Sequence, residues 1–101
     1  WGDVKRTQVL PNYPNPFNPD TWIPFDLAEP GPVTVSVYDD LGRAVRHVDL
    51  GHMPAGAYRT RDRAAYWDGR NDAGEPVASG AYFIELSAGS LRQTRRTTLA
   101  K

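Results

Sequence analysis

The sequence is a chain of 101 residues that is formally neutral, with 12 basic and 12 acidic side chains. Neutrality argues against a general nucleic-acid-binding protein, because such proteins carry an excess of Lys and Arg. The chain has no cysteine, which excludes disulfides, thiolate metal sites and a cysteine nucleophile. Hydrophobic residues make up 40% and aromatic residues 11%, a composition typical of one globular domain. No apolar run is long enough to span a membrane.

The first motif is NYPNPFNP, residues 12–19, which we call the strap. Its three prolines exclude a helix, because each lacks an N–H and favours an extended residue before it. Tyr13 and Phe17 are large rings that a flexible linker would not need. The motif therefore predicts a stiff segment that Tyr13 and Phe17 anchor to the rest of the domain.

The segment TWIPFDL, residues 21–27, is the first expected strand. Alternation places Ile23, Phe25 and Leu27 on one face of it. Pro24 cannot donate a hydrogen bond to a neighbouring strand, so the pattern indicates a strand at the edge of a sheet.

The clearest strand is VTVSVYD, residues 33–39. Its inward residues Val33, Val35 and Val37 alternate with residues that carry a hydroxyl group: Thr34, Ser36 and Tyr38. The sequence DDLG after it predicts a turn. Further short strands are expected at residues 43–50, 53–59, 63–69, 80–89 and 91–100. About seven short strands separated by turns are typical of an all-β sandwich, and we predict this fold class for the chain.

Clusters of titratable residues give little indication of catalysis or metal binding. The carboxylates within residues 62–75 lie close together, but DGRNDAGE lacks the alternating ligands of a calcium loop and is explained by turn formation. His47 and His52 have no third ligand candidate nearby in the sequence. No serine lies in a nucleophile-elbow motif. We therefore expect no catalytic residues, no metal site and no cofactor.

Three aromatic residues form a possible ligand platform: Tyr66, Trp67 and Tyr82. Exposed rings of this kind could bind a sugar. Adjacent residues of a strand point to opposite faces, so one of Tyr66 and Trp67 is expected inside and the other outside. Packing in the core is the commoner fate of such rings.

The last expected strand is rich in arginine. Residues 90–101 contain Arg92, Arg95, Arg96 and Lys101 and no acidic residue. These side chains could bind an acidic partner. Charge on a terminal strand also discourages edge-to-edge aggregation, and the sequence leaves both interpretations open.

The order of the motifs resembles a known family. The strap is followed by GPVTVSVYDDLGRAV, PAGAY, YWDGRNDAGEPVASGAYFIEL and a final TRRTTLAK. This arrangement resembles the type A C-terminal sorting domains of the type IX secretion system and the related immunoglobulin-like domain of the flagellar hook-capping protein. The version here is similar to those of large surface proteins of sponge-associated bacteria. The resemblance extends from Leu10 to Lys101.

The resemblance implies an immunoglobulin-like β-sandwich in residues 10–101, with residues 1–9 as the tail of a preceding domain or a linker. It implies a non-catalytic module that sorts a larger exported protein for secretion and anchors it at the cell surface. Its partners would be upstream cargo domains of the same chain and the outer-membrane secretion machinery, with no nucleic acid. The protein would be secreted or displayed at the surface, through the periplasm of a Gram-negative-type bacterium.

The family signal lies in the last strands. The expected sorting and partner-binding residues are Arg92, Arg95, Arg96, Thr97, Leu99 and Lys101. The alternative function is an immunoglobulin-like binding module of a surface protein, with a glycan or a protein as ligand.

Overall fold

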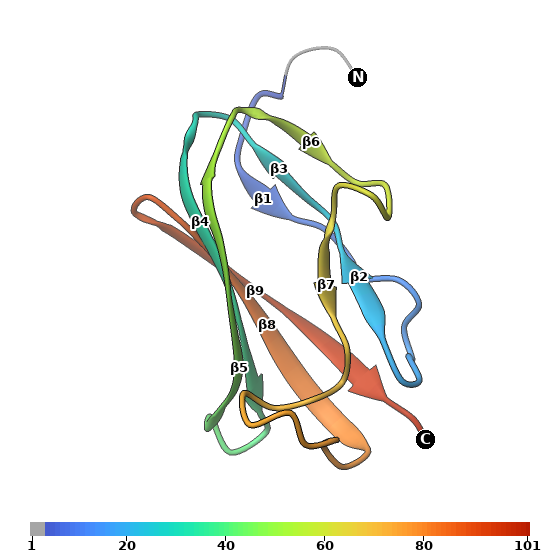
Figure 1. The fold of residues 1–101 in the computed structure, drawn as a ribbon. Helices are drawn as coiled ribbons and strands as arrows, with labels where there is room; N and C mark the ends of the chain where they lie inside the picture. Colours follow the sequence, from blue (N-terminus) through green and yellow to red (C-terminus); the bar gives the residue numbers. More distant parts are fainter. Residues whose placement is uncertain (1–3) are drawn as a thin grey trace.

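Two layers of antiparallel strands pack against each other, as Figure 1 shows. The structure is a computed structural model that describes residues 4–101; residues 1–3, the start of the predicted tail, lie outside the described residues. The four-stranded layer has the order β5 (Ala44–Met53), β4 (Gly31–Asp39), β8 (Gly80–Ala88) and β9 (Leu91–Leu99). The all-β prediction is confirmed.

The facing layer consists of two smaller sheets. One contains β1 (Gln8–Val9), β3 (Phe25–Leu27) and β6 (Gly56–Tyr58), and the other pairs β2 (Thr21–Ile23) with β7 (Ala65–Trp67). The described residues thus form nine strands rather than about seven. The difference arises because one expected strand is divided and because β1 has only two residues, too few for an alternating pattern to be recognised.

Pro24 divides the segment that the sequence presents as a single strand. Ile23 ends β2, which pairs with β7, whereas Phe25 begins β3, which lies between β1 and β6. The expectation of one edge strand over residues 21–27 is therefore wrong. The physical cause is that proline has no N–H for a strand ladder, so the chain changes pairing partners at this point.

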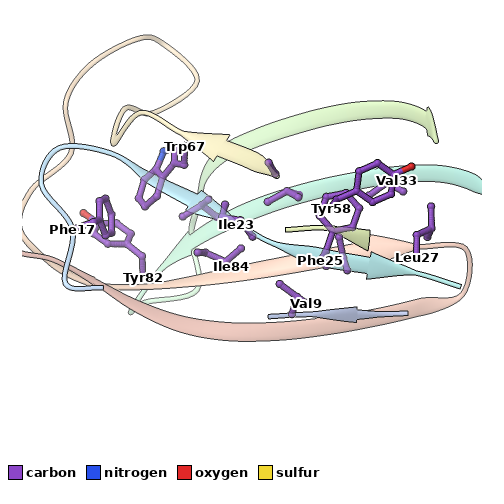
Figure 2. Packing of buried hydrophobic residues seen from close by; sticks show 14 of the residues in the cluster. Val9, Phe17, Ile23, Phe25, Leu27, Val33, Tyr58, Trp67, Tyr82 and Ile84 are labelled. Carbon is purple, nitrogen blue, oxygen red and sulfur yellow. The ribbon is translucent and has the colours of Figure 1, made fainter. Parts of the chain in front are cut away.

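The core lies between the two layers (Figure 2). Val33, Val35 and Val37 of β4 are fully buried, as their alternation predicts. They lie beside Ile84 and Leu86 of β8, which are also fully buried. A buried side chain of this size stabilises a fold by roughly 1.5–3 kcal/mol. The facing layer contributes a set of apolar side chains: Val9, Ile23, Phe25, Leu27, Tyr58, Ala65 and Trp67.

The loop after β7 fixes the end of the strap. Gly69 has φ = +76°, and a Cβ at this position would lie 2.2 Å from the carbonyl oxygen of Pro19. A larger residue would be strained and would collide with the backbone of the strap. In the same loop, Asn71 Oδ1 accepts hydrogen bonds from the amides of Ala73 and Glu75. The polar residues of DGRNDAGE therefore stabilise a turn, as expected.

Candidate functional site

The β9 strand forms one edge of the four-stranded sheet. It pairs with β8 in an unbroken antiparallel register from Ala88↔Leu91 to Gly80↔Leu99. Among the strands of residues 4–101, β8 is its only ladder partner, so the other side of β9 faces outward. The strand that the sequence marks as the candidate recognition element is therefore an edge strand.

The strap covers the C-terminal end of this edge. The Phe17 amide donates to the Thr98 carbonyl at 2.9 Å, and the Ala100 amide donates to the Phe17 carbonyl at 3.0 Å. The amide of Thr98 donates to Asn15 Oδ1 at 3.1 Å. The strap thus contributes a short parallel bridge beside Leu99.

A buried polar network attaches the strap to β2 and β9. Asn12 Nδ2 donates to Thr97 Oγ1 at 2.7 Å and to Thr21 Oγ1 at 3.0 Å. Thr21 Oγ1 in turn donates to the carbonyl of Pro14 at 3.0 Å. All three side chains of the network are buried. Its hydrogen bonds offset the cost of burying polar groups, and they explain why threonine occupies an inward position of the last strand.

The expected sorting residues divide into two groups. Thr97 and Leu99 are buried and hold β9 to the core, so they are inaccessible in this conformation. Arg92, Arg95, Arg96 and Lys101 are exposed and accessible to a partner. The sequence did not separate these two roles.

The exposed arginines have few strong contacts of their own. Arg92 lies 4.0 Å from a carboxylate oxygen of Glu85, at the limit of an ion pair. Arg95 Nε donates to the Val9 carbonyl at 3.3 Å. Surface contacts of this kind contribute little to stability, so the guanidinium groups can be engaged by a partner at small cost.

The two predicted anchors of the strap differ in burial. Phe17 is 1% exposed, and its ring centroid lies 5.2 Å from that of Trp67. Tyr13 is half-buried, and its hydroxyl donates to the Arg59 carbonyl at 2.5 Å. Phe17 is thus a core residue, whereas Tyr13 attaches the strap through one polar contact and a bridge to Trp22.

The possible aromatic platform does not form as three exposed rings. Trp67 and Tyr82 are buried with edge-on ring packing at 5.3 Å, whereas Tyr66 is 45% exposed. Trp67 points inward and Tyr66 outward, as alternation predicts. The neighbour of Tyr66 is Trp22 at 5.3 Å between ring centroids, because β2 pairs with β7 and places these residues opposite each other.

One ion pair was not singled out from the sequence. Asp26 is 2% exposed and accepts two hydrogen bonds from Arg59, at 2.6 and 2.9 Å. Gln8 Nε2 donates to the same carboxylate at 2.9 Å. The Arg59 hydrogen bond lowers the pKa of Asp26 below its usual value and outweighs the opposite effect of burial. No short motif marks this pair, because Asp26 lies in β3 and Arg59 directly follows β6, far along the chain.

Metal binding has no support in the geometry of residues 4–101, where no three His, Asp or Glu side chains gather in an arrangement that could hold an ion. None of the described residues belongs to a helix that could cross a membrane.

Solved structures with similar folds include two long chains from Porphyromonas gingivalis. The first is dimeric latent PorU, with a TM-score of 0.62 and 14% identity over 95% of this chain and 10% of that chain. The second is PorZ, whose structure is described as that of an essential bacterial surface component of the type-IX secretion system. It has a TM-score of 0.56 and 20% identity over 94% of this chain and 11% of that chain. These likenesses show a shared fold.

FLGD from P. aeruginosa is also similar, with a TM-score of 0.52 and 28% identity over 73% of this chain and 56% of that chain. The present chain thus spans about a tenth of PorU and PorZ and about half of FLGD. No curated protein matches the sequence. The model of the FlgD Ig-like domain matches residues 23–91, which is most of the chain and confirms the predicted immunoglobulin-like sandwich. The chain therefore belongs to the FlgD Ig-like domain family.

Proposed function

We propose that this domain is a non-catalytic sorting and surface-anchoring module of a larger exported protein. In this proposal, outer-membrane secretion machinery recognises its last strands, and the cargo is the part of the chain that precedes the domain. The protein is then secreted or held at the cell surface after passing through the periplasm. Nearly the whole chain is similar in fold to a segment that makes up about a tenth of PorZ, a surface component of the type-IX secretion system. This similarity supports the assignment.

The observation that carries the proposal is the exposure of the last strand. β9 is fixed by its inner face, where Thr97 and Leu99 are buried, while its arginines are exposed along a sheet edge. An edge strand offers backbone groups to another chain. A receptor can therefore engage the outer side of β9 without unfolding the domain.

Replacement of three arginines tests this surface. A reporter is fused ahead of residues 1–101 and expressed in a bacterium that carries a type IX secretion system, with Arg92, Arg95 and Arg96 each changed to Gln. We expect the fraction of reporter at the cell surface to fall by about tenfold, because loss of several partner-facing charges weakens recognition by 1.4 kcal/mol or so. Surface labelling and cell fractionation measure it.

The matched control changes to Gln three exposed arginines of the β4–β5 and β6–β7 connections: Arg43, Arg61 and Arg63. This control has the same net charge as the test variant and should be exported normally. Equal export of both variants and the parent would contradict recognition through the arginines. Circular dichroism and urea unfolding establish that both variants remain folded.

A second candidate function is an immunoglobulin-like binding module for a glycan or protein ligand. The contact between exposed Tyr66 and half-buried Trp22 favours it, with Arg61 stacked 4.3 Å from the Trp22 ring. The hydroxyl of Tyr66 donates to Asp20 at 2.7 Å and places a polar group beside the rings. In this function the ligand would contact β2 and β7 rather than β9, so Tyr66→Ala would abolish ligand binding and leave export unchanged.

A further inference from the structure

Besides Thr98, which bonds to the strap, three residues of β9 direct their backbone groups away from β8. In an antiparallel strand, each residue directs its N–H and C=O to the same side, and the side alternates from one residue to the next. The N–H and C=O of Thr98 both bond to the strap, and the register with β8 is unbroken. Arg92, Thr94 and Arg96 therefore also direct their backbone groups outward.

The strap leaves these three residues uncovered. The strap contacts only the C-terminal end of this edge, from Thr97 to Ala100. Within residues 4–101, no strand is paired to the outer side of β9. The uncovered length, residues 91–96, accommodates an added strand of roughly 20 Å.

The neighbouring edge of the other layer is β1, and side chains of β9 form hydrogen bonds with its backbone. The Val9 amide donates to Gln93 Oε1 at 2.9 Å, and the Val9 carbonyl accepts from Arg95. Side chains of β9 thus satisfy the edge of β1 without using the outward backbone of β9. A polar groove of about 320 Å³ lies between β1 and β9. It is lined by Arg6, Gln8, Val9, Gln93, Thr94 and Arg95.

The charge around this edge is positive. Arg6, Arg92, Arg95 and Arg96 are exposed there, and Glu85 is the acidic residue paired with Arg92. Antiparallel pairing with a second copy, centred on Thr94, would place Arg92 opposite Arg96 twice. Like charges directly opposite each other destabilise a strand pair, so the edge disfavours self-association and favours an acidic partner.

We propose that the β9 edge over residues 91–96 binds an extended acidic segment of another polypeptide as an added strand. The backbone of Arg92, Thr94 and Arg96 supplies the ladder hydrogen bonds, and the surrounding arginines select carboxylates. The inference rests on the proposed sorting function for the biological partner, which would be a component of the secretion machinery.

A proline at position 94 tests the ladder directly. Thr94→Pro removes an outward N–H and places the ring where an added strand would lie, while the N–H groups that bond to β8 belong to neighbouring residues. Thr94→Val keeps the N–H and the branched shape and serves as the matched control. The probe is a short synthetic peptide of alternating valine and glutamate, titrated into the isotope-labelled protein of 101 residues.

We expect the acidic peptide to slow amide hydrogen exchange at Arg92, Thr94 and Arg96 in the parent and in Thr94→Val. Binding by Thr94→Pro should be at least about tenfold weaker, because a ladder hydrogen bond is lost and a steric block is added. The corresponding lysine peptide should not bind. An acidic peptide N-methylated on alternate residues should also fail to bind, and this arm does not depend on the folding of any variant.

Equal binding of the acidic and lysine peptides, unchanged binding after N-methylation, or protection of amides outside β9 would overturn the proposal. Dimerisation of the protein through β9 would also overturn it.

The reporter assay separates the two proposals. If Thr94→Pro is exported like Thr94→Val while the arginine variant is not, the ladder inference fails and the sorting function stands. If the acidic peptide binds β9 but no variant alters export, the sorting function fails and the ladder inference stands.

Discussion

Replacement of Phe17 with Ala is expected to lower the free energy of unfolding by about 3–5 kcal/mol, the usual cost of removing a buried phenylalanine ring. Phe17 is 1% exposed and packs against Trp67, while its backbone bridges to β9. Loss of the ring leaves a cavity and loosens the strap from the last strand. For a domain of this size the melting temperature should fall by at least about 12 °C.

Two controls separate the ring of Phe17 from the rest of the strap. Phe17→Leu keeps an apolar side chain at the site and should cost only about 1 kcal/mol. Tyr13→Phe removes the hydroxyl that donates to the Arg59 carbonyl and should also cost about 1 kcal/mol. Urea unfolding followed by tryptophan fluorescence measures all three variants. A loss below about 1 kcal/mol for Phe17→Ala would show that the strap is not an anchor of the core.

Replacement of Asp26 with Asn is expected to lower the free energy of unfolding by about 2 kcal/mol at neutral pH. Removing one partner of a fully buried ion pair costs about 3–5 kcal/mol, but the side chain of Arg59 is 38% exposed and water can replace part of the lost interaction. Asp26 itself is 2% exposed and also accepts a hydrogen bond from Gln8. Urea unfolding at neutral pH measures the effect.

The same variant gives the pH dependence of this ion pair. The hydrogen bond from Arg59 holds the pKa of Asp26 below its ordinary value of 3.8, so the carboxylate stabilises the fold above that value. This stabilisation is lost as the pH falls from 3.8 through the lower pKa of the folded state. The difference between the parent and Asp26→Asn should therefore shrink in this range. A difference that stays constant as the pH falls would contradict the assignment.

The parts of the fold that could be predicted from the sequence are those with long alternating patterns. Val33, Val35 and Val37 repeat with period two, and the structure buries all three. β1 was not predicted as a strand because its two residues carry no periodic signal. The structure includes Gln8 and Val9 in the sandwich, ahead of the domain start expected at Leu10. The assignment of residues 1–9 to the tail of a preceding domain or to a linker stays a prediction.

The candidate site was harder to predict from the sequence than the fold, because its properties depend on which strands lie next to each other. The arginines of the last strand could be named from composition, but the outward direction of Thr94 follows only from the register with β8 and the contacts of Thr98. Likewise, the contact between Trp22 and Tyr66 requires the pairing of β2 with β7. The buried hydrogen bond from Asn12 to Thr97 also joins positions far apart in the chain.

The most direct test of the sorting function is a comparison of two hosts. A periplasmic reporter fused ahead of residues 1–101 is expressed in a bacterium with a complete type IX secretion system and in the same strain lacking its outer-membrane component. Surface labelling and fractionation measure where the folded reporter lies. We predict display at the surface in the complete host and retention in the periplasm of the other. Equal display in both hosts, or retention in both, would contradict the proposed function.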